Sequence, residues 1–142
     1  MTLELIQIYK ETLYKLILAI IFGGIIGAER TFAHKQVGLR TFSLVSLGAC
    51  LFSLIAFNFP SDSNSRILAN IIVGIGFLGG GIIFLHHDKL VGATTAAALW
   101  VTAAIGALIG QGYYFESFST IILVLVILVI LEYIEKRMRN EN

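Results

Sequence analysis

The chain has 142 residues, of which 57% are hydrophobic and 13% are charged, and its mean hydropathy is +0.87. This composition is too apolar for an ordinary water-soluble domain. The formal net charge of +1 provides no basic field, so we expect no nucleic acid partner. The single cysteine, Cys50, excludes an internal disulfide and a cysteine-rich metal site.

Five stretches are long and apolar enough to cross a bilayer, whose hydrocarbon core of about 30 Å needs roughly 20 helical residues. They cover residues 13–28, 41–59, 67–85, 95–113 and 118–134. The breaks between them carry polar or turn-forming residues, so neighbouring helices should run antiparallel. The sequence therefore predicts an all-α, polytopic five-helix transmembrane bundle that forms one domain over residues 1–142, with the lipid bilayer around it.

The basic residues that bear on topology lie in two clusters close to membrane ends. They are Arg30, Lys35 and Arg40 in the first loop, and Lys136, Arg137 and Arg139 in the tail. An odd number of crossings places both clusters on one side, and positive residues favour the cytoplasm. We therefore expect an outside N-terminus and a cytoplasmic C-terminus.

Small residues recur every fourth position on three of the predicted helices. These stripes are Ala19, Gly23 and Gly27; Gly76 and Gly80; and Ala98, Thr102, Gly106 and Gly110. In lipid, helices associate largely through close packing, which such stripes allow. We expect a tight inner bundle with homo-oligomer contacts, and a bulky fifth helix at the periphery.

Gly74, Gly76 and Gly79 satisfy the G-x-G-x-x-G pattern of dinucleotide-binding folds, but they lie inside one apolar span without a preceding strand. We therefore expect no cofactor. The run His86, His87 and Asp88 does not form a metal site, because three consecutive side chains of a helix cannot converge on one ion. The sequence contains no nucleophile with a base, so we expect no catalytic residues.

Polar residues gather at the predicted cytoplasmic ends of the helices. Glu29 ends the first crossing and Arg40 begins the second, so Glu29 can pair with Arg40 or with Arg30. This pair either fixes the hairpin or has a functional role. Thr94 and Thr95 begin the fourth helix, where their hydroxyls can cap its free amides or the helix start can receive an anion.

Several spaced motifs resemble the membrane domain of the MgtC/SapB family of bacterial inner-membrane proteins. They are GAER at 27–30, VGLRT at 37–41, GIGFLG at 74–79, GATTAA at 92–97, LW at 99–100 and AAIG at 103–106. The positions that match the family are Glu29, Arg30, Gly38, Arg40, Thr41, Gly76, Gly79, Gly92, Thr95 and Trp100. Of these, we assign the glycines and Trp100 to helix packing, and the charged residues and threonines, with Thr94, to a functional polar cluster.

The resemblance implies five helices in the cytoplasmic membrane and links to magnesium limitation, survival in macrophages and restraint of the ATP synthase. The chain stops at Asn142, before the soluble domain that many members add, so we do not expect that domain's activity here. Where virulence-associated members carry asparagine before Thr-Ala-Ala, this chain has Thr94. A non-enzymatic regulator that binds a membrane complex, such as an ATP synthase, is the preferred hypothesis, and a small channel or transporter for magnesium or another cation is the alternative.

Overall fold

A computed structural model describes residues 2–57, 60–86 and 89–140. The helices and strands are α1 (Thr2–Phe32), α2 (Leu39–Phe57), α3 (Ser61–Ile82), β1 (Phe84–His86), β2 (Lys89–Val91), α4 (Ala93–Gln111), α5 (Tyr114–Val126), the π-helix η1 (Ile127–Leu131) and α6 (Glu132–Asn140). Five helices are long and apolar enough to span a membrane, with α5, η1 and α6 forming one of them. The expected all-α membrane bundle is therefore confirmed.

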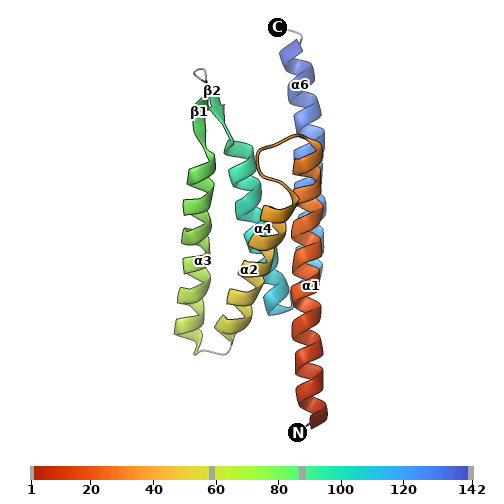
Figure 1. The fold of residues 1–142 in the computed structure, drawn as a ribbon, viewed down its shortest axis with the longest axis vertical. Coiled ribbons are helices and arrows are strands. Elements are labelled where there is room, and N and C mark those ends of the chain that lie inside the picture. Colours follow the sequence, from red (N-terminus) through yellow and green to blue (C-terminus); the bar gives the residue numbers. More distant parts are fainter. Residues whose placement is uncertain (1, 58–59, 87–88, 141–142) are drawn as a thin grey trace.

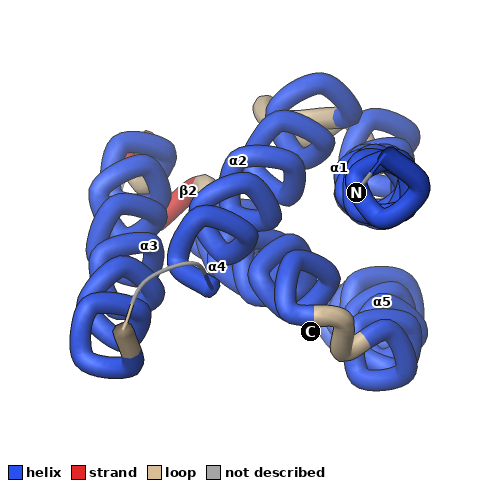
Figure 2. The backbone as a smooth tube through the Cα atoms, turned by 90° about the horizontal axis from the view of Figure 1, so that it is seen from below, coloured by secondary structure: helices blue, strands red, loops and turns tan. Residues whose placement is uncertain are grey.

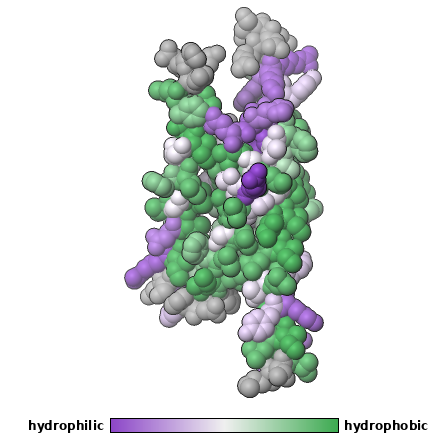
Figure 3. All heavy atoms as spheres, in the orientation of Figure 1, coloured by the Kyte–Doolittle hydropathy of each residue, from purple (hydrophilic) through white to green (hydrophobic). Residues whose placement is uncertain are grey.

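The helices lie roughly alongside one another, and α2 and α4 form the centre of the bundle (Figures 1 and 2). α1 and α5 pack on one side of this pair, and α3 packs on the other. The end of the bundle that carries the β-strands, the 33–38 loop and α6 is called the hairpin end below. Hydrophilic residues gather along α6 and the loop at this end, while a hydrophobic band covers the middle of the bundle (Figure 3).

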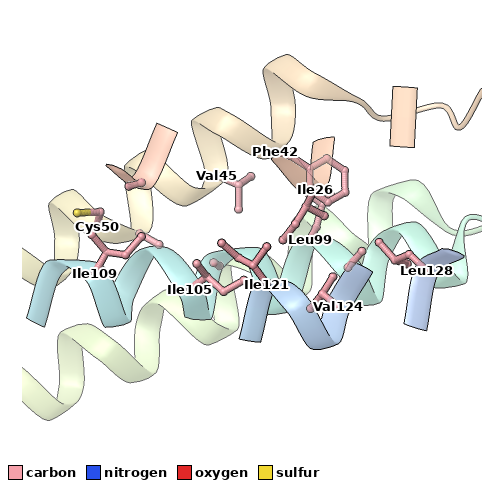
Figure 4. Close-up of a cluster of buried hydrophobic side chains, with 14 residues drawn as sticks. Ile26, Phe42, Val45, Cys50, Leu99, Ile105, Ile109, Ile121, Val124 and Leu128 are labelled. Carbon is pink, nitrogen blue, oxygen red and sulfur yellow. The ribbon is translucent and has the colours of Figure 1, made fainter. Parts of the chain in front are cut away.

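Buried apolar side chains from α1, α2, α4, α5 and η1 meet in one cluster (Figure 4). Among the described residues, α3 contributes no fully buried hydrophobic side chain to it. Only 6% of the spanning window of α3 is buried, compared with 56% for α4. α3 therefore leaves most of its surface to lipid or to a partner.

Glycines let α1 and α4 approach α2 closely. A methyl group at Gly23 would lie 2.5 Å from the carbonyl oxygen of Phe42, and one at Gly110 would lie 2.8 Å from that of Cys50. Gly27 meets the backbone of Leu39, and Gly106 meets the backbone of Ser46. Two of the three small-residue stripes therefore face the same central helix.

The third stripe lies elsewhere, because a methyl group at Gly76 or Gly80 would meet nothing within 4 Å. Gly79 alone of the α3 glycines among the described residues has a near neighbour, with Ala96 at 3.5 Å. Trp100 is 46% exposed, so it does not pack in the interior as expected. In the fifth span, Ile121, Val124 and Leu128 are buried and the rest is largely exposed, which places that helix at the edge of the bundle.

The helix boundaries differ from the expected spans at several points. α1 begins at Thr2, about three turns before the expected position 13, and continues to Phe32, and α3 begins at Ser61 and ends at Ile82. The expected third span included positions 83–85, but α3 has ended there, and Phe84 and Leu85 belong to an antiparallel hairpin in which Phe84 pairs with Val91. Two predictions extend beyond the described residues. One is the end of the second span, at positions 58–59, and the other is the absence of a metal site at His86, His87 and Asp88, of which His87 and Asp88 are not described.

Candidate functional site

The centre of the candidate site is Arg30, whose side chain is 1% exposed near the end of α1. Its guanidinium donates two hydrogen bonds to the Glu29 carboxylate, with a distance of 2.7 Å from Nη2 to Oε1. The Nη2 atom also lies 3.6 Å from Oε2 of Glu132. Because a buried guanidinium requires compensating charge, these two carboxylates explain how α1 accommodates Arg30.

Glu132, at the start of α6, connects the two ends of the chain. Its Oε1 atom lies 3.0 Å from Nζ of Lys35 and 3.0 Å from Nζ of Lys136. Together with Glu29 and Arg30, these residues form an ion-pair network at the hairpin end, which we call the charge cluster. Three cations face two carboxylates in the charge cluster, so it carries an excess positive charge.

The 33–38 loop that carries Lys35 is held by Thr31. The Thr31 hydroxyl donates to the Gly27 carbonyl at 2.9 Å and accepts a hydrogen bond from the amide of Leu39 at 3.0 Å. Gly38 approaches this hydroxyl so closely that a side chain there would collide with it. The loop is therefore short and fixed, and it brings the end of α1 to the start of α2.

The start of α4 faces the charge cluster across a cavity of about 750 Å³. The cavity is lined by Arg30, Lys35, Thr94, Thr95, Glu132 and Lys136, among others. Gly92 precedes α4 with a φ of 91°, a left-handed conformation that favours glycine, and its Cα faces the carbonyl of Ile82 at the end of α3. This turn directs the first residues of α4 toward the cavity.

The structure brings together one part of the predicted polar cluster and separates the rest. Arg30, Thr94 and Thr95 line the cavity, and Glu29 pairs with Arg30. Arg40 is exposed and has no ion pair among the described residues, so the alternative pairing of Glu29 with Arg40 is not formed. Thr41 lies on a different surface, a groove between α2 and α3.

The proposed capping role of the threonines is also absent, because no side chain caps the start of α4. Sequence reasoning missed Glu132 as a member of the site and used Lys35 and Lys136 for topology alone. One local signal was present: Glu132 follows a long apolar run and stands four residues before Lys136, the spacing of a helical ion pair. The contact of Glu132 with Lys35 joins positions 97 residues apart and has no local signal.

Among the described residues, no group of three or more histidine, cysteine, aspartate or glutamate side chains is arranged to hold a metal ion. Cys50 is buried in the core, where it packs near Gly110. Ser46, also on α2, has a buried hydroxyl without a hydrogen-bond partner. The chemistry of the site therefore resides in the charge cluster and in the start of α4.

A helical bundle with five apolar spans and a charge cluster at one end defines a polytopic membrane protein. The family model described as "MgtC family" matches residues 16–137, and the chain belongs to this family. No solved structure gave a significant match.

The chain is similar to three curated relatives from different bacteria. It is 38% identical to "Putative magnesium transporter YhiD" of Escherichia coli K12, over 93% of this chain and 66% of the relative. It is 41% identical to "Uncharacterized protein slr0014" of Synechocystis, over 83% of this chain and 51% of the relative. It is 42% identical to "Protein MgtC" of Salmonella typhimurium 14028s, over 78% of this chain and 48% of the relative. The chain thus spans about half to two thirds of the length of these relatives.

Proposed function

We propose that this chain is a non-enzymatic regulatory protein of the bacterial inner membrane that binds another membrane protein complex through the exposed face of α3. We further propose that an ATP synthase-like complex is the target during adaptation to low magnesium or stress. A second copy of the chain is the other binding partner that the same face would accept. In this proposal the hairpin end faces the cytoplasm, since the first loop, the start of α2 and α6 carry the basic residues Lys35, Arg40 and Lys136.

The observation that carries this proposal is the open glycine face of α3. Methyl groups at Gly76 and Gly80, four residues apart on one side of α3, would meet nothing within 4 Å, whereas the glycines of α1 and α4 are engaged with α2. Lipid gains little from a glycine surface, but a second helix gains close backbone contact. A face of this kind is therefore better suited to a protein than to acyl chains.

A polar group on a second side of α3, next to α2, also favours a protein partner. Asn70 is exposed on α3 and lines a groove of about 800 Å³ between α2 and α3, together with Gly48 and Gly74. Its amide has no hydrogen-bond partner among the described residues. An amide in hydrocarbon favours a partner helix that can supply a hydrogen bond.

ATP-driven proton pumping in inverted membrane vesicles, prepared from cells with and without the chain, tests this proposal. We expect the wild-type chain to lower pumping and Gly76→Leu with Gly80→Leu to abolish the effect, since leucines would separate the helices. Ala104→Leu is the matched control, because it enlarges an exposed small residue of α4 outside the α3 face. Pumping that is unaffected by wild-type chain excludes the ATP synthase target, and equal inhibition by the α3 variant excludes this face.

The alternative is a magnesium transporter, a role that one relative's name suggests. Magnesium prefers carboxylate ligands, and the described carboxylates inside the spans are Glu29, Glu132 and Glu135 near the hairpin end and Glu4, Glu11 and Glu116 toward the opposite end. Liposomes that contain the purified chain and a magnesium dye separate the two functions. Robust flux that is lost in Glu29→Gln would replace the regulatory proposal with the transport one.

A further inference from the structure

The cavity at the hairpin end brings three kinds of anion-binding group together. It lies between the charge cluster and the start of α4, and its volume of about 750 Å³ exceeds that of a single ion. Its lining residues lie near the hairpin-end limits of the apolar spans, where headgroups of a bilayer meet solutes of the aqueous phase. The cavity is separate from the exposed face of α3 described above.

The first group is the set of free amides at the start of α4. Within the described part of the chain, the amides of Ala93, Thr94 and Thr95 have no hydrogen-bond acceptor, whereas the amide of Ala96 bonds the Gly92 carbonyl at 2.9 Å. All three residues line the cavity. Unpaired amides at a helix start carry partial positive charge and bind anions.

The second group is the hydroxyl of Thr95. Thr95 is 5% exposed, and its hydroxyl makes no hydrogen bond within the described part of the chain. The hydroxyl is not a buried atom, and since Thr95 lines the cavity, this otherwise enclosed residue can donate a hydrogen bond to an occupant. The residue thus supplies an independent indication that the cavity receives a ligand.

The third group is the set of cationic donors on the opposite wall. Arg30, Lys35 and Lys136 share the carboxylates of Glu29 and Glu132. Glu135 also lines the cavity, so the carboxylates of this wall equal its cations in number, and the wall contributes directed donors rather than a net positive field. An anion in the cavity would compete with Glu132 for the two lysines.

We propose that this cavity binds a phosphate group, carried either by an anionic phospholipid or by a phosphorylated solute. Amides, a hydroxyl and ammonium groups on several sides suit a tetrahedral oxyanion, whose oxygens accept hydrogen bonds in several directions. Glu132 acts as the internal competitor that holds Lys35 and Lys136 when phosphate is absent.

The test has two arms, both with purified protein in dodecyl maltoside. Isothermal titration with inorganic phosphate measures binding of a soluble anion, and native mass spectrometry after addition of phosphatidylglycerol measures retained lipid. Thr95→Val should weaken the binding about five- to tenfold, because it removes one donor and preserves volume. Glu132→Gln should strengthen binding, which a folding defect would not produce. Thr102→Val, on the same helix but away from the cavity, is the matched control and should leave binding unchanged.

Each outcome of the two arms bears on the proposal. Phosphate binding that follows this order of variants supports a phosphorylated solute, and lipid retention that follows the same order supports a headgroup. Absence of binding in both arms overturns the proposal. Equal binding by wild type, Thr95→Val and Glu132→Gln, with all three folded by their thermal unfolding, also overturns it.

Discussion

Arg30 shows how a single residue organises the hairpin end. Arg30 is 1% exposed at the end of a membrane helix. This burial is tolerable because two carboxylates face its guanidinium, one from the preceding residue and one from α6. Removing one partner of such a buried pair costs more than the pair contributes, since the remaining charge is left without compensation. Glu29 is therefore required for the burial of the Arg30 side chain.

Glu29→Gln should lower the free energy of unfolding by about 2 kcal/mol, because Arg30 would keep only the longer contact with Glu132. Glu135→Gln on α6 is the control, and it should change stability by less than about 0.5 kcal/mol. Unfolding by sodium dodecyl sulfate in mixed micelles measures both values. Equal stability of the two variants would mean that Glu29 does not compensate Arg30.

Exchanging charges separates the two pairings that the sequence left open. Because Glu29 bonds Arg30 and not Arg40, Glu29→Arg combined with Arg40→Glu should remain as unstable as Glu29→Arg alone. Glu29→Arg combined with Arg30→Glu should recover part of the stability. Thermal midpoints of the purified variants report the result, and rescue by the Arg40 exchange would contradict the structure.

Two serines of α2 make a matched pair. The Ser53 hydroxyl donates to the Ala107 carbonyl at 2.8 Å, whereas the Ser46 hydroxyl is buried without a partner. Ser53→Ala should cost about 1 kcal/mol, and Ser46→Ala should be neutral or stabilising because it removes an unsatisfied group. Chemical unfolding in micelles compares them. A cost at Ser46 as large as that at Ser53 would show that the Ser46 hydroxyl has a partner.

At the scale of the elements, α2 is the helix around which the others pack. Glycines of α1 and α4 approach its backbone, and α3 touches it along a looser groove. The same residue type thus serves two purposes in one chain: contact inside the bundle on α1 and α4, and an open surface on α3.

Substituting glycine on the two kinds of stripe should give opposite results. Gly106→Ala places a methyl group against the backbone of Ser46, which cannot move away as a side chain can, so we expect a loss of about 2 kcal/mol. Gly76→Ala meets open space and should be neutral, or gain up to about 1 kcal/mol from helix propensity. Unfolding in mixed micelles measures both, and a comparable loss at Gly76 would show that α3 is packed.

Much of this arrangement could be predicted, because the length of the apolar stretches and the periodic small residues indicate membrane helices. The short β-hairpin could not be predicted, because Phe84 and Leu85 continue an apolar run. A short apolar run fits a strand as well as a helix. The stripe on α3 looked like those on α1 and α4, because spacing shows that a face is flat but not what lies against it. The pairing of Lys35 with Glu132 depends on the bundle being assembled and so had no signal in either segment.

At the scale of the whole molecule, the two ends of the bundle differ in character. The hairpin end carries the charge cluster, the cavity and the basic residues of α6, and the opposite end carries the start of α3 beside Pro60. A bilayer would cover the hydrophobic band between them. This asymmetry places the charged site on one side of the membrane.

The central claim is that the bundle spans the membrane with its hairpin end in the cytoplasm. Single cysteines at Gln36, in the hairpin-end loop, and at Pro60, at the opposite end, test it directly by labelling with a membrane-impermeant maleimide; both positions are exposed, whereas native Cys50 is buried. The account predicts labelling of Pro60→Cys in intact cells and labelling of Gln36→Cys only after permeabilisation. Labelling of Gln36→Cys in intact cells would contradict it.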